Sequence, residues 1–252
     1  MGISRYDGLT QKDGETIRWT GKVRLVESAL DLPLRWKKPR RIFVNSMSDL
    51  FHEKVPDQWI FDILKIIVAA PQHVYQVLTK RPERMLATIP EMYKSFRYHF
   101  DSPGPETPLR NLWLGVSVED QATADARIPL LLQTPAAVRF VSLEPLLGPM
   151  DLRQYVRPTK GFIVPYYANL NWVIVGGESG PGARPFDLAW ARSAIAQCRA
   201  AGVACFVKQL GAHPEQGIET VPLRMMSLGL RDRKGADPAE WPEDLRVREY
   251  PG

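Results

Sequence analysis

The chain has 252 residues, of which 44% are hydrophobic and 24% are charged, so the composition excludes an intrinsically disordered protein. The net charge of +5 is spread along the chain and favours polyanionic partners only mildly. The two cysteines, Cys198 and Cys205, exclude a disulfide framework and suit a reducing compartment. No signal peptide and no run of about 18 apolar residues occurs, so we expect a cytoplasmic protein without a membrane partner.

Six short segments rich in Val, Ile and Phe alternate with helical patterns along the chain. The segments expected to form strands are 41–46, 74–80, 112–119, 138–148, 172–177 and 204–211. The expected helices are 56–70, 81–96, 120–134 and 187–202, the last with Asp187 as its N-cap and Gly202 as its stop. This alternation is typical of parallel sheets. No glycine fingerprint follows the first strand, so the pattern favours an α/β fold with a partial (β/α) TIM-like barrel of about six parallel strands.

The last part of the chain differs in composition from the rest. From residue 212 onward the sequence is rich in Pro, Gly and charged residues and has no strand–helix alternation. We therefore expect residues 1–211 to form the barrel domain and residues 212–252 to form a C-terminal tail that packs on it.

Polar residues follow each of the expected strands. Because the carboxyl ends of parallel strands meet at one edge, these residues predict a site there for a polar, partly charged ligand. The alternative is that they cap helices and satisfy loop backbone groups. The predicted ligand-binding set consists of Asn45, Ser46, Ser48, Asp49, Thr79, Lys80, Arg81, Ser117, Glu119, Glu144, Gly177, Glu178, Arg184, Lys208 and Gln209.

The loop in "WVIVGGESGPGARPFD" (172–187) contains four glycines and runs into an expected helix. It matches neither a P-loop nor a G-x-G-x-x-G motif, so the glycines alone are weak evidence for a bound phosphate. Its Glu178 and Arg184 are the expected ligand contacts. The one tight polar cluster with a histidine is Asp49, His52 and Glu53, and no residues have metal-ligand spacing, so we predict no metal site. No catalytic residue is assigned.

Six segments read in order carry a family resemblance: "RRIFVNSMSDLFHEKVP", "VYQVLTKRPERM", "LWLGVSVED", "VRFVSLEPLLG", "WVIVGGESGPGARP" and "FVKQLG". Over residues 17–252 the chain resembles the phage- and prophage-associated three-cysteine-motif family of unknown function. The resemblance implies a partial barrel similar to radical S-adenosylmethionine (SAM) enzymes, with SAM bound by the strand-end residues. It also implies a four-iron four-sulfur cluster held by three cysteines, and a partner protein encoded beside the family.

The chain departs from this family in its cysteines. The family's three cysteines lie upstream of the region equivalent to "RYDGLT", and Cys198 and Cys205 do not match them. We therefore expect no cofactor in this chain and no radical chemistry from it, because two thiols on separate elements do not replace three cluster ligands on one loop. Two explanations stay open: a truncated or late-started chain, and a relative without a cluster that keeps only the binding site.

Two other functions compete with a radical SAM-like scaffold. The first is a cluster-less binding module for nucleic acid or for a phage or host protein, suggested by "LRWKKPRR" (34–41), which has five cations among eight residues. The same run can instead be a solvated approach to a strand. The second is a barrel enzyme that uses acid–base carboxylates, which the glutamates at three strand ends permit.

Overall fold

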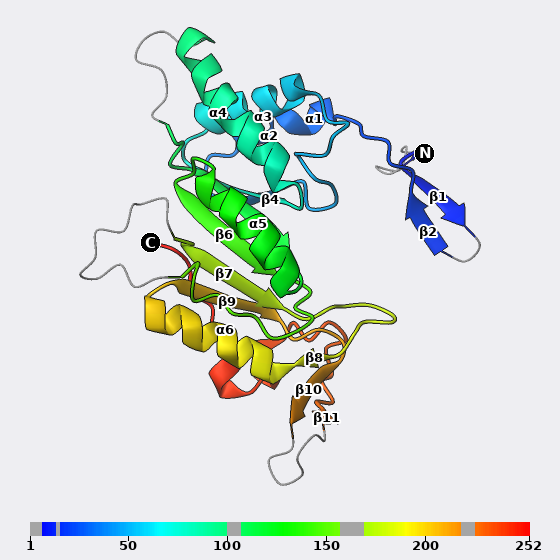
Figure 1. The fold of residues 1–252 in the computed structure, drawn as a ribbon. Coiled ribbons are helices and arrows are strands. Elements are labelled where there is room, and N and C mark those ends of the chain that lie inside the picture. Colours follow the sequence, from blue (N-terminus) through cyan, green and yellow to red (C-terminus); the bar gives the residue numbers. More distant parts are fainter. Residues whose placement is uncertain (1–6, 14–15, 100–106, 157–168, 218–224) are drawn as a thin grey trace.

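The computed structural model describes residues 7–13, 16–99, 107–156, 169–217 and 225–252, and its centre is a six-stranded parallel sheet (Figure 1). The sheet curls into a half-barrel with the strand order β3-β4-β5-β6-β7-β9. This confirms a mixed α/β fold with six parallel strands. The strands are β3 (Arg41–Val44), β4 (Val74–Thr79), β5 (Leu112–Val118), β6 (Val138–Leu143), β7 (Trp172–Gly176) and β9 (Ala204–Gln209).

Four long helices connect or follow these strands, and each agrees with its predicted segment. One has both of its predicted local signals: Asp187 accepts a hydrogen bond from the backbone of Ala189 at 2.8 Å, and Gly202 ends the same helix with φ 70°. At another, Asp120 and Thr123 form a capping box. The helices are α3 (Asp57–Ala69), α4 (Pro82–His99), α5 (Gln121–Gln133) and α6 (Leu188–Ala201).

The two faces of the sheet carry different apolar clusters, because successive side chains of a strand point to opposite faces. Leu114, Val116 and Val118 of β5 are fully buried in the larger cluster, together with the helices. On the other face, Phe140 and Trp172 belong to a smaller cluster. A Cβ atom on Gly115 would lie 2.5 Å from the Phe140 ring, so this face needs a glycine there. The aromatic side chains therefore fill the concave side of the half-barrel.

The N-terminal part contains short elements that the sequence analysis did not anticipate. Residues 10–13 and 16–19 pair as two antiparallel strands, with Thr10 opposite Trp19. Two one-turn helices follow before the sheet begins. The elements are β1 (Thr10–Asp13), β2 (Thr16–Trp19), α1 (Glu27–Leu30) and α2 (Leu32–Arg35).

The C-terminal residues cover the β9 edge of the sheet. The backbone N–H of Val207 donates to the carbonyl of Val247 at 2.8 Å, and that of Glu249 donates to the carbonyl of Cys205 at 2.9 Å. A small second sheet, β11-β10-β8, joins two strands of this part of the chain to residues 186–187. It consists of β8 (Phe186–Asp187), β10 (Pro214–Gly217) and β11 (Met225–Ser227). The tail thus contacts the half-barrel, while a domain division after residue 211 stays a prediction.

Strand β3 forms the opposite edge of the sheet. Within the residues that the structure describes, β3 pairs with β4 and with no other strand. Its Phe43 is 44% exposed, which is high for an aromatic side chain on a strand. In the described part of the chain, one edge of the half-barrel is therefore covered by the C-terminal residues, and the other has no further strand beside it.

Candidate functional site

Charged residues that follow the strands come together at the carboxyl edge of the sheet, which is the edge at the arrowheads in Figure 1. We call this edge the mouth of the half-barrel and define it by three ion pairs, two of which join different strand ends while the third lies within the loop after β7. Backbone hydrogen bonds link those loops: Leu147 donates to the carbonyl of Glu119 at 2.9 Å, and Leu146 to that of Gly176 at 3.0 Å. The three pairs are Lys80–Glu119, Lys208–Glu144 and Arg184–Glu178.

Glu119 follows β5 and lies between two cations. Its Oε1 accepts a short hydrogen bond from Lys80, which follows β4. Its Oε2 accepts from Arg127 of α5 at 3.0 Å, and the same Arg127 nitrogen donates to the carbonyl of Ser117 at 2.6 Å. The Glu119 carboxylate thus binds Arg127 of α5 and Lys80 from the neighbouring strand end, and Lys80 is the more exposed of the two cations.

Glu144 and Lys208 form the second pair, above small residues of the sheet. Lys208 Nζ lies 2.9 Å from both carboxylate oxygens of Glu144. A Cβ atom on Gly176 would lie 3.3 Å from this carboxylate, so the glycine leaves the space that it occupies. Ser117 and Ser142 are register partners on the two strands before the mouth. Small and polar side chains therefore lead from the concave face to the charged rim.

The glycine-rich loop after β7 closes on itself through the third pair. Arg184 donates from Nε and Nη2 to the two oxygens of Glu178, at 2.7 and 3.0 Å, and also donates its backbone N–H at 3.0 Å. These hydrogen bonds lower the pKa of Glu178 to about 2. They also raise the pKa of Arg184, with a smaller contribution from the charge of Glu119. The two residues predicted as ligand contacts are therefore paired with each other.

The mouth has an excess of positive charge. Four cations, Lys80, Arg127, Arg184 and Lys208, face the three carboxylates of Glu119, Glu144 and Glu178. The carboxylates are the less exposed partners: Glu144 is 20% exposed in its side chain and Lys208 53%. The flexible lysines can therefore move toward a ligand while the carboxylates stay in place.

Another part of the predicted set ties the β3 and β4 loops together. Asp49 accepts from the Thr79 hydroxyl at 2.7 Å, from the backbone of Lys80 at 3.0 Å and from the Arg81 side chain at 2.9 Å. Arg81 also pairs with Glu53 at 3.1 Å. Asp49, Thr79 and Arg81 are thus engaged with one another, as expected for residues that hold loops.

Gly177 and Gln209 have a backbone role. The Gly177 N–H donates to the carbonyl of Gln209 at 3.0 Å, and the Gln209 side chain donates to the carbonyl of Gly177 at 2.9 Å. A Cβ atom on Gly177 would collide with the carbonyl oxygen of Leu210. The need for glycine at 177 therefore comes from the neighbouring chain segment, whether or not a ligand binds.

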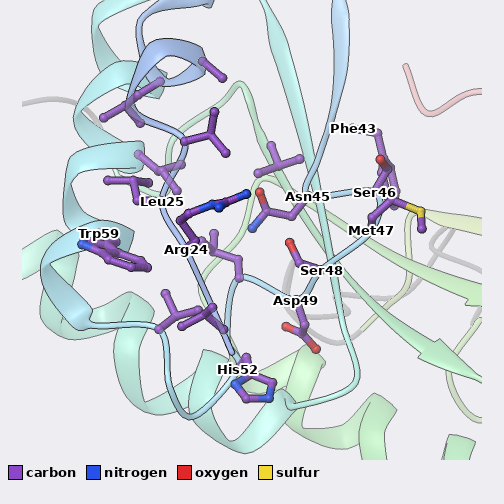
Figure 2. A pocket seen from close by; sticks show the side chains of 18 of the residues that line it. Arg24, Leu25, Phe43, Asn45, Ser46, Met47, Ser48, Asp49, His52 and Trp59 are labelled. Atoms are coloured by element: carbon purple, nitrogen blue, oxygen red, sulfur yellow. The ribbon is translucent and has the colours of Figure 1, made fainter. Parts of the chain in front are cut away.

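Asn45, Ser46 and Ser48 line a different space. Together with Asp49 they line a cavity of about 640 Å³ between β3, α3 and the N-terminal segment (Figure 2). We call it the β3–α3 cavity. Asn45 has φ 58°, a left-handed conformation that turns the chain at the end of β3. The predicted residues thus divide between the mouth, the loop contacts and this cavity.

The residues present do not fit the iron–sulfur cluster that the resemblance implies. Cys198 of α6 and Cys205 of β9 are both buried, and the hydrogen bond with Cys198, together with burial, raises the pKa of Cys205. Among the described residues, no three His, Cys, Asp or Glu side chains come together as metal ligands. The cluster of Asp49, His52 and Glu53 named from the sequence has partners within the protein: His52 Nδ1 accepts a hydrogen bond from the backbone of Lys54 at 3.1 Å, and Glu53 pairs with Arg81.

The basic run 34–41 lies on the approach to β3. Arg35 pairs with Asp31, the Arg40 guanidinium lies 4.4 Å from the centre of the Trp36 ring, and that of Arg41 lies 3.7 Å from the centre of the Tyr250 ring. Three of the five cations thus have partners within the protein. Binding of nucleic acid by this run stays a prediction.

Two features of these sites were missed in the sequence. Arg127 lies seven residues after Asp120, the N-cap of α5. Seven residues are about two helical turns, so Arg127 lies on the same side of the helix as the strand end that precedes the helix. That spacing could have identified it. The β3–α3 cavity had no comparable signal, because its walls come from separate segments whose apolar residues all look like core.

The fold and the mouth define an α/β half-barrel protein with a charged rim at the carboxyl edge of its sheet. Residues 3–238 match the family described as "Protein of unknown function (DUF5131)", and the chain belongs to this family. The match includes both the half-barrel and most of the tail. Neither the curated proteins nor the solved structures contain a match to the chain. No helix within the described residues is long and apolar enough to cross a membrane.

Proposed function

We propose that the mouth binds a small zwitterionic ligand of the S-adenosylmethionine type, on a scaffold related to radical SAM enzymes and of phage or prophage association. The observation that carries the proposal is the row of three cation–carboxylate pairs on successive strand-end loops. An amino-acid group carries one carboxylate and one ammonium, so it can exchange partners with such pairs without leaving a charge unpaired.

Each pair has a role in this proposal. Lys208 and Lys80 are the half-exposed cations and would take the ligand carboxylate. Glu144 and Glu119 are the less exposed carboxylates and would take the ammonium group. Gly176 leaves room beside Glu144, where any other residue would place a Cβ atom at 3.3 Å. Arg184 and Glu178 already neutralise each other and would hold the loop at the rim of the site.

The proposal contains no step through an iron–sulfur cluster. The sequence has two cysteines, both buried in the core, and they do not provide the three thiolates that such a cluster takes. The role assigned to the residues of this chain is to bind and orient a ligand.

Isothermal titration calorimetry with SAM and S-adenosylhomocysteine tests the proposal. We expect Lys208→Gln and Glu144→Gln each to weaken binding by roughly 10- to 100-fold, the effect of losing one charge-assisted hydrogen bond. The matched controls are Lys94→Gln and Glu91→Gln, which remove an exposed 2.7 Å ion pair on α4. If the mouth variants bind as tightly as the controls, or the unaltered protein binds neither compound, the proposal is wrong.

A further inference from the structure

We propose that the β3–α3 cavity is a second binding site, for an elongated apolar small molecule that carries a hydrogen-bond acceptor at its buried end. This site is separate from the three ion pairs of the mouth, so its existence does not depend on the proposed function. Three features of the cavity support this site: its walls, one buried hydroxyl group without a partner, and the distribution of polar residues along its length.

The walls are mostly apolar. Trp59, Ile63 and Ile67 come from α3, and Ile42 and Val44 come from β3. The N-terminal segment closes the remaining side with Val23, Leu25, Leu30 and Pro33, and it also contributes Lys22 and Arg24, of which Arg24 extends toward Asn45 at the polar end (Figure 2). A volume of about 640 Å³ lies within the range of about 300–1,000 Å³ that is usual for small-molecule sites. The cavity therefore has the size and the lining of a site for an apolar ligand.

The buried end of the cavity is marked by Tyr75 of β4. This side chain lines the cavity and is 2% exposed, yet its hydroxyl group has no hydrogen-bond partner. A buried hydroxyl without a partner costs roughly 1–3 kcal/mol, so the great majority of such groups are satisfied. Burial raises the pKa of Tyr75 to about 12, so the group is protonated at neutral pH and can donate.

The neighbouring histidine cannot serve as that partner. The rings of His73 and Tyr75 are 6.2 Å apart and nearly perpendicular. Nδ1 of His73 accepts from the backbone N–H of Arg40 at 3.1 Å, which places the ring proton on Nε2. Nε2 in turn lies 2.9 Å from the carbonyl oxygen of Pro33. Both ring nitrogens are occupied, and the Tyr75 hydroxyl is left for a group that enters the cavity.

The other end of the cavity is polar. Tyr75 is the register partner of Ile42, near the start of β3, whereas Asn45, Ser48 and Asp49 follow the end of that strand. Three strand residues separate the two ends, a distance of roughly 10 Å. Figure 2 shows Asn45, Ser48, Asp49 and His52 along this end. A ligand that fits would be apolar along its length, with its acceptor at Tyr75 and a tolerance for polar groups at the loop.

A strand of a second protein copy, added to the open edge of β3, is the alternative occupant. Such a strand would lie in the plane of the sheet, because backbone hydrogen bonds extend from its edge. Tyr75 instead belongs to the face of the sheet that packs against the helices, in the cluster that contains Ile67. Its hydroxyl is therefore better placed for a molecule held between the sheet and α3.

The test uses the full chain and the fluorescent ketone 6-propionyl-2-(dimethylamino)naphthalene, a neutral apolar molecule whose emission shifts to the red when its carbonyl accepts a hydrogen bond. We expect saturable binding with one site per chain. Tyr75→Phe keeps the shape of the cavity and removes the donor, so it should weaken binding roughly two- to tenfold and shift the bound emission to the blue. Ala29→Trp should abolish binding, because Ala29 lines the cavity.

The control for the larger side chain is Ala196→Trp, the same substitution on the exposed face of α6. It should leave probe binding unchanged. Equal binding by Ala29→Trp and Ala196→Trp would overturn the proposal, as would Tyr75→Phe with unaltered affinity and emission. Sedimentation velocity provides a further check: a dimer that Ala29→Trp dissociates, and to which the probe does not bind, would assign the cavity to a second copy and would also overturn it.

Discussion

Glu178 illustrates how single residues of the mouth obtain their chemistry from close neighbours. The side chain was predicted as a ligand contact, and so was Arg184, six residues further along the same loop. The structure brings the two together in a bidentate pair. The sequence could place both residues at the rim, because strand ends share an edge. It could not show their pairing, since that depends on the path of a loop in which Gly180 and Gly182 have φ of 102° and 74°.

The first prediction at this scale concerns the ionisation of Glu178. Its pKa is lowered from the ordinary 4.5 to about 2 by the hydrogen bonds from Arg184. The loop stability that comes from the pair is therefore fully present above pH 4.5 and is lost as the pH falls toward 2. A carbon-13 NMR titration of the Glu178 carboxyl group should give a midpoint near pH 2, and in Arg184→Gln the midpoint should rise toward 4.5.

The control for this titration is Arg153→Gln, which removes the Arg153–Asp151 pair in another loop. It should leave the midpoint of Glu178 where it is in the unaltered protein. A midpoint near 4.5 in the unaltered protein would contradict the pairing in the loop.

Asp49 and Gly177 depend on tertiary neighbours in the same way. Both were predicted to contact a ligand because of where they stand in the sequence. In the structure, the carboxylate of Asp49 is surrounded by donors from the β4 loop, and Gly177 packs against the backbone of Leu210. A place directly after a strand identifies residues that can face a ligand. It does not distinguish them from residues whose side chains hold the loops in place.

At the scale of elements, the long helices and the six parallel strands could be predicted because several local signals agree. Helix α6 has an aspartate before it, an apolar face along it and a glycine after it. The missed elements, such as β8 (Phe186–Asp187) and α1 (Glu27–Leu30), span two and four residues. Elements of that length carry no periodic pattern and form only because tertiary neighbours supply their hydrogen bonds.

A prediction at this scale concerns Trp241, which anchors the tail. Its side chain is almost fully buried, and Nε1 donates to the carbonyl of Gly235 at 3.0 Å. We expect Trp241→Ala to lower the free energy of unfolding by about 3–5 kcal/mol, as measured by urea denaturation. Met226→Ala, at a side chain that is 54% exposed, should change it by less than about 0.5 kcal/mol. Equal unfolding midpoints for the two variants would show that the tail does not support the half-barrel.

At the scale of the whole molecule, the half-barrel has two different edges. The β9 edge is covered by residues 247–249, whereas β3 pairs with β4 alone among the described residues and borders the β3–α3 cavity. The parallel sheet could be predicted from the alternation of strands and helices. The cavity could not, because Val23, Trp59 and Tyr75 meet only after three separate segments have folded together. The mouth could be predicted in part: the residues of its three ion pairs were named from the sequence, and their pairing was not.

The central claim is that the mouth of the half-barrel binds a zwitterionic ligand. The most direct test is hydrogen–deuterium exchange with and without SAM, measured on the full chain. The account predicts slower exchange in the strand-end loops at residues 79–82, 119–122, 144–147 and 177–184, and unchanged exchange in α1 and α2. Protection confined to the N-terminal segment and α3, or no protection at saturating ligand, would contradict the claim.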